Sequence, residues 1–246
     1  MATIYVTVNG KQIPVDGNSS VLDAINASGT PIPQLCKDPD MKPIGACRTC
    51  LVDIDGVRGF PASCSTPVTE GMIVSTNTES VQAIRKGVLE LTAGMLPKSD
   101  KSSFQDLSNA IHNSATSGNV WPGRIRGKTD SSNPIFNIAM EDCILCGRCA
   151  QACQSGHQFI GAIDVIGTGT DARIGSFMDG PLIDSVCTTC GQCLSVCPTG
   201  AISPKERVPD IVKTIKTTCP YCGVGCGVKA RVDDSGVIRE MLDDPD

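Results

Sequence analysis

The sequence has few aromatic residues and little excess charge. Aromatic side chains make up only 3% of the 246 residues, which argues against one large apolar core and favours several small domains. The formal net charge is −5, and no region carries the basic excess that a nucleic-acid-binding surface needs. We therefore expect no nucleic-acid partner.

Long apolar runs are also absent. No run reaches the length of a membrane span, and the first ten residues, MATIYVTVNG, lack the features of a signal peptide and a twin-arginine signal. The sequence predicts a cytoplasmic, soluble protein without a membrane span. Cysteine, in contrast, occurs 15 times. Because cytosolic thiols are kept reduced, so many cysteines favour metal ligation over disulfides, and small domains often need such sites for stability.

The cysteines fall into four groups that leave none over. The groups, in chain order, are Cys36, Cys47, Cys50 and Cys64; Cys143, Cys146, Cys149 and Cys153; Cys187, Cys190, Cys193 and Cys197; and Cys219, Cys222 and Cys226. The last group is one ligand short of four.

The second and third groups share the spacing C-x2-C-x2-C-x3-C and repeat after 44 residues. This is the pattern of a duplicated bacterial ferredoxin, in which the fourth cysteine of each run ligates the other cluster. Two [4Fe–4S] clusters are therefore expected, each on a set of three cysteines from one run and the fourth cysteine of the other run. We call these ligand sets the second set and the third set. The second set is Cys143, Cys146, Cys149 and Cys197; the third set is Cys187, Cys190, Cys193 and Cys153. Paired zinc knuckles are the alternative, which four cysteines within eleven residues disfavour.

The first group, which we call the first set, has the spacing C-x10-C-x2-C-x13-C. It suits a [2Fe–2S] cluster held by a long loop and one distant cysteine. Before it, residues 3–8 alternate as a strand, Asn9-Gly10 predicts a hairpin turn, and Ser20 and Asp23 form a capping box for a helix to about residue 27. Hairpin, helix and cluster loop are the order of a plant-type ferredoxin. A zinc-bound or free-thiol β domain is the alternative.

The remaining segments carry weaker signals. Val81, Ile84, Val88 and Leu91 predict a helix with this stripe in the core, and residues 159–165 predict a strand. Residues 98–134 are rich in Ser, Asn, Thr and Gly and predict a linker. No nucleophile stands with a base, so we expect no catalytic residue in this chain. The last group, with the spacing C-x2-C-x3-C, suits a cluster with a ligand from elsewhere, or a partial zinc knuckle.

Four stretches of the sequence, the first of them in two parts, resemble the N-terminal region of cytoplasmic formate dehydrogenase catalytic subunits of the molybdenum/tungsten bis-pterin type. The stretches are IGACRTCLVDI (44–54), RGFPASCSTPV (58–68), EDCILCGRCAQAC (141–153), CTTCGQCLSVCPTGAI (187–202) and TCPYCGVGCG (218–227). In that family the last motif opens the catalytic domain, and a fourth cysteine follows. The resemblance thus implies that Cys219, Cys222 and Cys226 are three ligands of a [4Fe–4S] cluster beside the pterin.

The sequence departs from the family pattern in two ways. A His/Cys3 motif for an extra cluster is missing, since residues 92–113 contain no cysteine. The pterin-binding and catalytic domain would lie beyond Asp246. We therefore expect an α+β chain with five segments: a β-grasp-like [2Fe–2S] ferredoxin domain (1–78), a covering helix (79–97), a linker (98–135), a 2[4Fe–4S] ferredoxin module (136–208) and the start of a molybdopterin-oxidoreductase [4Fe–4S] domain (209–246).

Tandem clusters serve to move electrons between separated sites. The resemblance implies the electron-relay part of formate dehydrogenase, an oxidoreductase, with the Mo/W-bis-pterin formate/CO₂ site outside this chain. The expected partners are a flavin/NAD(P)-binding or ferredoxin-type redox subunit and the catalytic domain. The alternative is a stand-alone relay subunit of a hydrogenase or NADH-linked complex.

Overall fold

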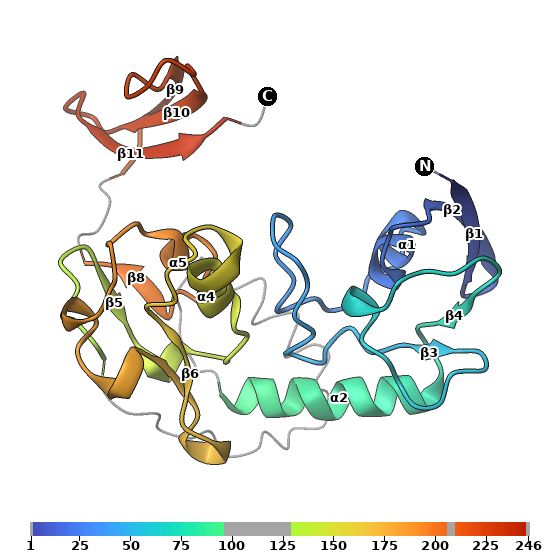
Figure 1. Cartoon of the computed structure of the whole chain (residues 1–246). Helices are drawn as coiled ribbons and strands as arrows, with labels where there is room; N and C mark the ends of the chain where they lie inside the picture. The colour runs from blue at the N-terminus through green and yellow to red at the C-terminus, as the bar shows by residue number, and fades with distance from the viewer. Residues whose placement is uncertain (1, 96–128, 206–209, 245–246) are drawn as a thin grey trace. The chain divides into compact units, whose positions relative to one another are not determined.

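The computed structural model describes residues 2–95, 129–205 and 210–244 (Figure 1). The chain divides into two compact units, Met1–Ser203 and Pro204–Asp246. Most of the predicted linker, 98–135, lies outside the described residues. The predicted domain boundaries remain predictions, because this division is coarser than the five predicted segments.

The first unit begins with a four-stranded sheet. The strands are β1 (Thr3–Val8), β2 (Lys11–Asp16), β3 (Asp53–Ile54) and β4 (Ile73–Ser75), in the order β2-β1-β4-β3. β1 pairs in parallel with β4, whereas the other pairs are antiparallel. Helix α1 (Val21–Ala27) buries four residues in the core formed with this sheet.

Local sequence signals explain this domain. Asn9 and Gly10 both take left-handed φ, 49° and 83°, in the turn between β1 and β2, as a tight hairpin requires. Ser20 and Asp23 form the predicted capping box of α1, with each side chain bonded to the other's backbone N–H. The hairpin and the helix predicted from the sequence are therefore confirmed.

Helix α2 (Glu79–Gly94) begins after Thr78, whose hydroxyl accepts a hydrogen bond from the Val81 N–H. The predicted core stripe is partly wrong, because Ile84 and Leu91 are 39% and 49% exposed. The buried residues of α2 are Val81, Leu89, Thr92 and Ala93. Leu89 and Ala93, four residues apart on one face of α2, pack against the cysteine-bearing loops around Cys36 and Cys146.

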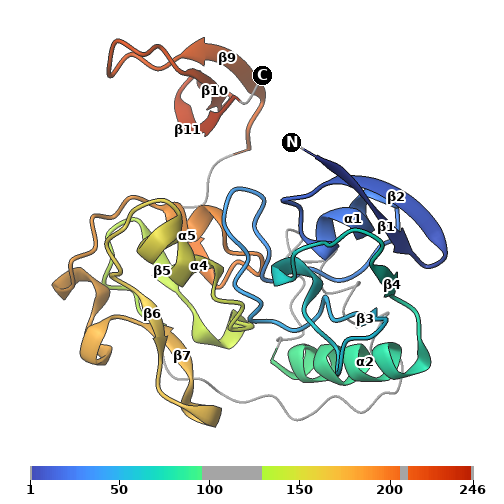
Figure 2. The same ribbon diagram turned by 45° about the vertical axis from the view of Figure 1, so that its right-hand side comes forward.

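The rest of the first unit consists of short elements, shown with α4 and α5 side by side in Figure 2. Two-stranded pairings join β5 with β8 and β6 with β7. The elements are β5 (Phe136–Ile138), α4 (Arg148–Gln151), a π-helical turn (Ala152–Gly156), β6 (Asp164–Ile166), β7 (Arg173–Gly175), α5 (Gln192–Ser195) and β8 (Ile202–Pro204), with single 3-10 turns at Ser63–Ser65, Met140–Asp142, Gly169–Asp171, Phe177–Asp179 and Leu182–Asp184. We call residues 129–203 the ferredoxin module.

The second unit is a three-stranded antiparallel sheet of β9 (Lys213–Thr218), β10 (Gly227–Val232) and β11 (Ile238–Asp243), in the order β11-β10-β9. The Asp233 carboxylate accepts hydrogen bonds from Ser235, Val237 and Arg239 in the turn between β10 and β11. Hydrogen bonds from Ser235 and then Arg239 lower the pKa of Asp233 below its usual range. Within the described ranges, no helix combines the length and apolar character that a membrane crossing needs.

Candidate metal centres

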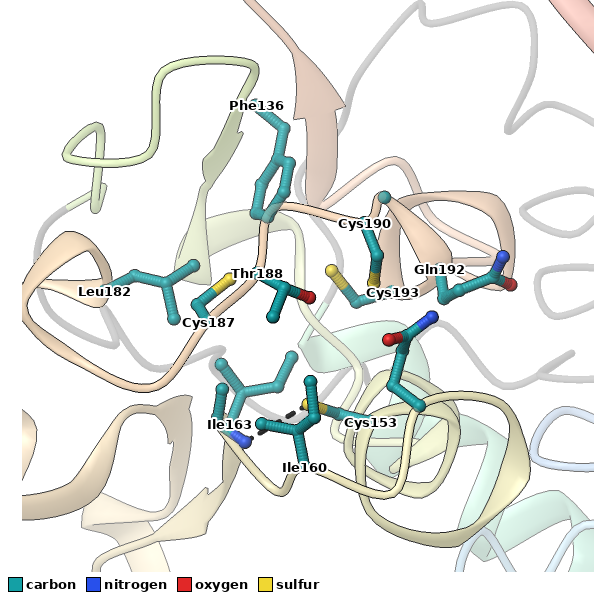
Figure 3. Close-up of a pocket in the computed structure, with 13 residues that line it drawn as sticks. Phe136, Cys153, Ile160, Ile163, Leu182, Cys187, Thr188, Cys190, Gln192 and Cys193 are labelled. Carbon is teal, nitrogen blue, oxygen red and sulfur yellow. Dashed lines mark hydrogen bonds between the residues drawn. The ribbon is translucent and has the colours of Figure 1, made fainter. Parts of the chain in front are cut away.

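The structure brings the second and third sets together around two separate cavities. Cys143, Cys146, Cys149 and Cys197 line one cavity, so the fourth cysteine of the later run joins three from the earlier run. Cys153, Cys187, Cys190 and Cys193 line the other (Figure 3). The remaining lining is largely apolar and includes Ile138, Ile174 and Ile202 in the first cavity and Phe136, Ile163 and Leu182 in the second. Thiolates in a dry, apolar shell suit an iron–sulfur cluster.

Backbone N–H groups point at sulfur in both cysteine runs. The N–H of Leu145 donates to the Cys143 sulfur and that of Thr189 to the Cys187 sulfur, each with 3.4 Å between nitrogen and sulfur. Leu145 and Thr189 hold left-handed φ of 53° and 59°. Each is followed by a left-handed glycine, Gly147 or Gly191, at the N-terminus of α4 or α5. The 44-residue repeat in sequence is thus also a repeat in backbone conformation.

The cross-over cysteines receive similar bonds from outside the runs. The Ala162 N–H donates to Cys153 at 3.2 Å, and the Ile202 N–H donates to Cys197 at 3.4 Å. The Asn133 side-chain amide donates to Cys187 at 3.9 Å and to the Thr189 hydroxyl at 3.3 Å. Hydrogen bonds to sulfur orient the ligands and tune the potential of a bound cluster. Sequence reasoning missed Asn133, because nothing in the local sequence marks it.

Burial differs between the two runs. Cys143, Cys146 and Cys149 are all at most 9% exposed, whereas Cys190 is exposed and Cys187 is half-buried. Burial raises the pKa of Cys146 to about 12, and the pKa of Cys193 is raised to about 12 by burial and by neighbouring cysteines. Burial also raises the pKa of Cys149. Ligation requires thiolates, so positive metal charge has to offset this cost of ionisation.

The first set is assembled from the loop 36–50 and the 3-10 turn at Cys64. Hydrogen bonds among the four thiols raise the pKa of Cys47 and Cys64, lower that of Cys36 to about 2 and lower that of Cys50 to about 6. Cys36, Cys50 and Cys64 are buried, and the Cys47 sulfur lies 3.1 Å from the Thr49 hydroxyl oxygen. Four neighbouring thiols, three of them buried, present the donors that a [2Fe–2S] cluster needs.

The three sets lie next to one another in a definite order. Cys36 of the first set shares a buried cluster with Cys146 of the second, and Cys47 packs against it. Cys143 and Cys149 of the second set share another cluster with Cys193 of the third. Among the buried clusters of the described residues, none joins the first set to the third. The second set therefore lies between the other two.

The last group lies on the loop between β9 and β10. The Cys219 N–H donates to the Cys226 carbonyl at 2.8 Å and closes the loop, while Cys222 and Cys226 are exposed. Residues 204–246 contain no fourth cysteine. These three thiols do not complete a four-cysteine site within their own unit.

In the part of the chain that the structure describes, no group of three or more His, Cys, Asp or Glu side chains is arranged to hold a single metal ion. The second and third sets surround an open space instead. Such a space fits a polynuclear cluster, whose iron atoms each meet one cysteine.

Three family models match the chain. Residues 1–79 match the 2Fe-2S iron-sulfur cluster binding domain, residues 181–203 the 4Fe-4S binding domain, and residues 212–246 the Molybdopterin oxidoreductase Fe4S4 domain. The predicted α+β succession is thereby confirmed: a [2Fe–2S] ferredoxin domain, a [4Fe–4S] ferredoxin module and the start of a molybdopterin-oxidoreductase [4Fe–4S] domain.

Relatives are found among oxidoreductase subunits. The chain is 32% identical to NADPH-Fe(3+) oxidoreductase subunit alpha of Geobacter sulfurreducens, over 98% of this chain and 29% of the relative. It is 28% identical to a Staphylococcus haemolyticus protein named "Putative formate dehydrogenase", over 96% of this chain and 28% of the relative. The chain thus spans less than a third of the length of these two relatives.

A solved structure is similar over most of the chain. It is the crystal structure of the NAD+-reducing [NiFe]-hydrogenase in the H2-reduced state. The similarity has a TM-score of 0.70 and 28% sequence identity, and it covers 83% of this chain and 88% of the matched chain.

Proposed function

We propose that this chain is the electron-relay region of a multi-subunit oxidoreductase. The first set holds one [2Fe–2S] cluster, and the second and third sets hold one [4Fe–4S] cluster each. Cys219, Cys222 and Cys226 supply three ligands of a further [4Fe–4S] cluster. The observation that carries the proposal is the exchange of Cys153 and Cys197 between the two cavities, since this exchange is the ligand pattern of two-cluster ferredoxins.

The order in which the three cysteine sets pack against one another supports a route for electrons along the proposed clusters. The second set packs between the first and the third sets. Three of its four cysteines are buried, more than in the third set. Cys190 of the third set is exposed. The protein's role is to hold the sulfur ligands and exclude water. Bound clusters would supply one-electron carriers, with the exposed Cys190 side exchanging electrons with another domain or protein.

We further propose that the relay serves a Mo/W-bis-pterin site that interconverts formate and CO₂, and that it functions in the cytoplasm with a flavin/NAD(P)-binding or ferredoxin-type subunit. The match of residues 212–246 to a molybdopterin oxidoreductase Fe4S4 domain supports this, as does the similarity to the staphylococcal relative. In this proposal the catalytic groups lie outside the 246 residues.

A second candidate is a relay subunit in a hydrogenase or NAD(P)H-linked complex. The similarity to a chain of the NAD+-reducing hydrogenase, of which 88% is covered, favours it, as does the similarity to the NADPH-linked Geobacter subunit. The two candidates share the three cysteine sets and differ in the electron donor.

Anaerobic purification of the chain with its natural partners tests both. The relay proposal predicts about ten iron atoms per chain for three occupied sets, and about fourteen if the last group is completed. Zinc in place of iron would contradict it. Formate as sole reductant should then develop the EPR signals of both cluster types, with about one equivalent of Mo or W present. Reduction by H₂ or NAD(P)H, with no response to formate, would select the second candidate.

A further inference from the structure

The loop between Cys36 and Cys47 is seated on the ferredoxin module. The Asp38 carboxylate accepts a hydrogen bond from the Arg148 guanidinium, and the Lys42 carbonyl accepts one from the Gln151 side-chain amide. The Arg148 and Asp38 side chains are only 17% and 7% exposed. Both partners in the module come from α4, the helix that carries Cys149. The loop that carries cysteines of the first set is therefore hydrogen-bonded to α4, the helix that carries a cysteine of the second set.

Apolar contacts shape the same interface. Met41 is buried with Ala152 and Val196. A Cβ at Gly156 would lie 2.4 Å from the Met41 sulfur, so the absence of a side chain there makes room for the loop. A Cβ at Gly147 would lie 3.1 Å from the Ile44 Cδ1. The module thus carries glycines at two places where the loop packs closely against it.

Arg148 joins the two sets through different parts of one residue. It lies two residues after Cys146 of the second set, while its guanidinium is held by Asp38, two residues after Cys36 of the first set. Removing one partner of a buried ion pair strongly destabilises a protein, because the remaining charge is left buried without compensation. The pair therefore resists separation of the loop from α4.

We propose that Arg148 is a positioning residue: paired with Asp38, it fixes the loop of the first set against α4 and so sets the rate of electron transfer between the first and second sets. The proposal rests on the relay function proposed above. It assigns the rate to a polar contact outside both ligand sets.

The test compares Arg148→Gln and Asp38→Asn in the complex that contains the chain, after reduction of the first cluster. Both variants should slow electron transfer to the second set several-fold and weaken the magnetic interaction between the two clusters. Because the two residues act as a pair, the double variant should be no slower than the slower single variant. Unchanged rates in both iron-loaded variants would overturn the proposal.

The potential of the cluster in the second set separates positioning from a general loss of stability. Removing the positive charge in Arg148→Gln should lower this potential, and removing the negative charge in Asp38→Asn should raise it. Arg148→Lys keeps the charge and should restore part of the rate. Rates that follow the potentials in opposite directions, rather than falling together, would contradict positioning.

Two further variants keep the test decisive if Arg148→Gln loses iron. Gly156→Ala introduces no charge and should slow the transfer by displacing Met41, with the potential unchanged. Arg173→Gln removes a matched arginine–aspartate pair, Arg173–Asp179, on the surface of the same module, and should change neither quantity. If the wild-type chain itself shows no transfer between the sets, the relay function fails. If the wild-type chain transfers electrons between the sets, and the Arg148, Asp38 and Gly156 variants transfer them at the same rate, the positioning role alone fails.

Discussion

The first domain (residues 2–79) and the ferredoxin module differ in how large a share of their buried cores consists of cysteines. The buried core of the first domain has sixteen members, of which two, Cys50 and Cys64, are cysteines. In the ferredoxin module the main core has eleven buried members, and three of them, Cys143, Cys149 and Cys193, are cysteines. Cys153, Cys187 and Cys197 pack against this second core. The first core is mainly aliphatic with two cysteines among its members, whereas the second is built around the cysteines of the second and third sets.

Secondary structure differs in the same direction. A four-stranded sheet and a capped helix support the first domain. The ferredoxin module has two-stranded pairings and two helices of four residues each, α4 and α5. Helices this short are not stable by themselves. We therefore expect the first domain to fold without metal, whereas the ferredoxin module should need its proposed clusters for its own fold.

Removal of iron should therefore unfold the ferredoxin module and leave the first domain folded. This is the largest effect we expect. After chelation under reducing conditions, residues 129–203 should lose most of their hydrogen-exchange protection, since metal-binding free energy is folding free energy in such modules. Residues 2–79 should keep the protection of β1, β2 and α1. The measurement is hydrogen exchange followed by mass spectrometry. Equal loss of protection in both regions would contradict the comparison.

Single-ligand variants should show the same asymmetry at the level of clusters. Cys50→Ala should abolish the [2Fe–2S] EPR signal and leave both [4Fe–4S] signals, because the first domain keeps its aliphatic core. Cys146→Ala should remove the cluster of the second set and also reduce occupancy of the third, since each cysteine run supplies one cysteine, Cys153 or Cys197, to the other run's site. Iron analysis and EPR measure both. Loss of every signal in Cys50→Ala would mean that the sites do not form independently.

Much of this arrangement follows from sequence. The hairpin at Asn9-Gly10, the capping box of α1 and the helix after Thr78 were all predicted, because each depends on interactions a few residues apart. The structure also brings together the second and third sets as the spacing predicts. Their role as cluster ligands stays a prediction.

Features that depend on distant contacts escaped prediction. The strand predicted at 159–165 is instead β6 (Asp164–Ile166), and Phe159 is exposed with a left-handed φ of 60°. The buried face of α2 was displaced because its partners come from two loops far apart in sequence. The Asp38–Arg148 pair, 110 residues apart, carries no local signal at all. Periodicity reports that a face is buried, but it does not report what buries it.

A core deletion in the first domain should have an intermediate effect. Leu22 of α1 is fully buried in the aliphatic core. Leu22→Ala should lower the free energy of unfolding of the iron-free first domain by about 2–5 kcal/mol. Denaturant unfolding of the chelated chain, followed by far-UV circular dichroism, measures the change. A much smaller loss would mean that the iron-free domain is not held by this core, and that it too depends on its cluster.

The smallest effect should come from the cap of α1. Ser20→Ala removes the hydroxyl that accepts from the Asp23 N–H at 3.2 Å and donates to the Asp23 carboxylate at 2.7 Å. Loss of such a cap costs about 1 kcal/mol. The same chelated chain and the same denaturant titration measure it, with Ser80→Ala, an exposed serine inside α2, as the matched control. Because the cap is local, the loss should be the same with and without iron. A loss that vanished in the iron-loaded protein would show that the bound cluster, and not the sheet and α1, holds the first domain together.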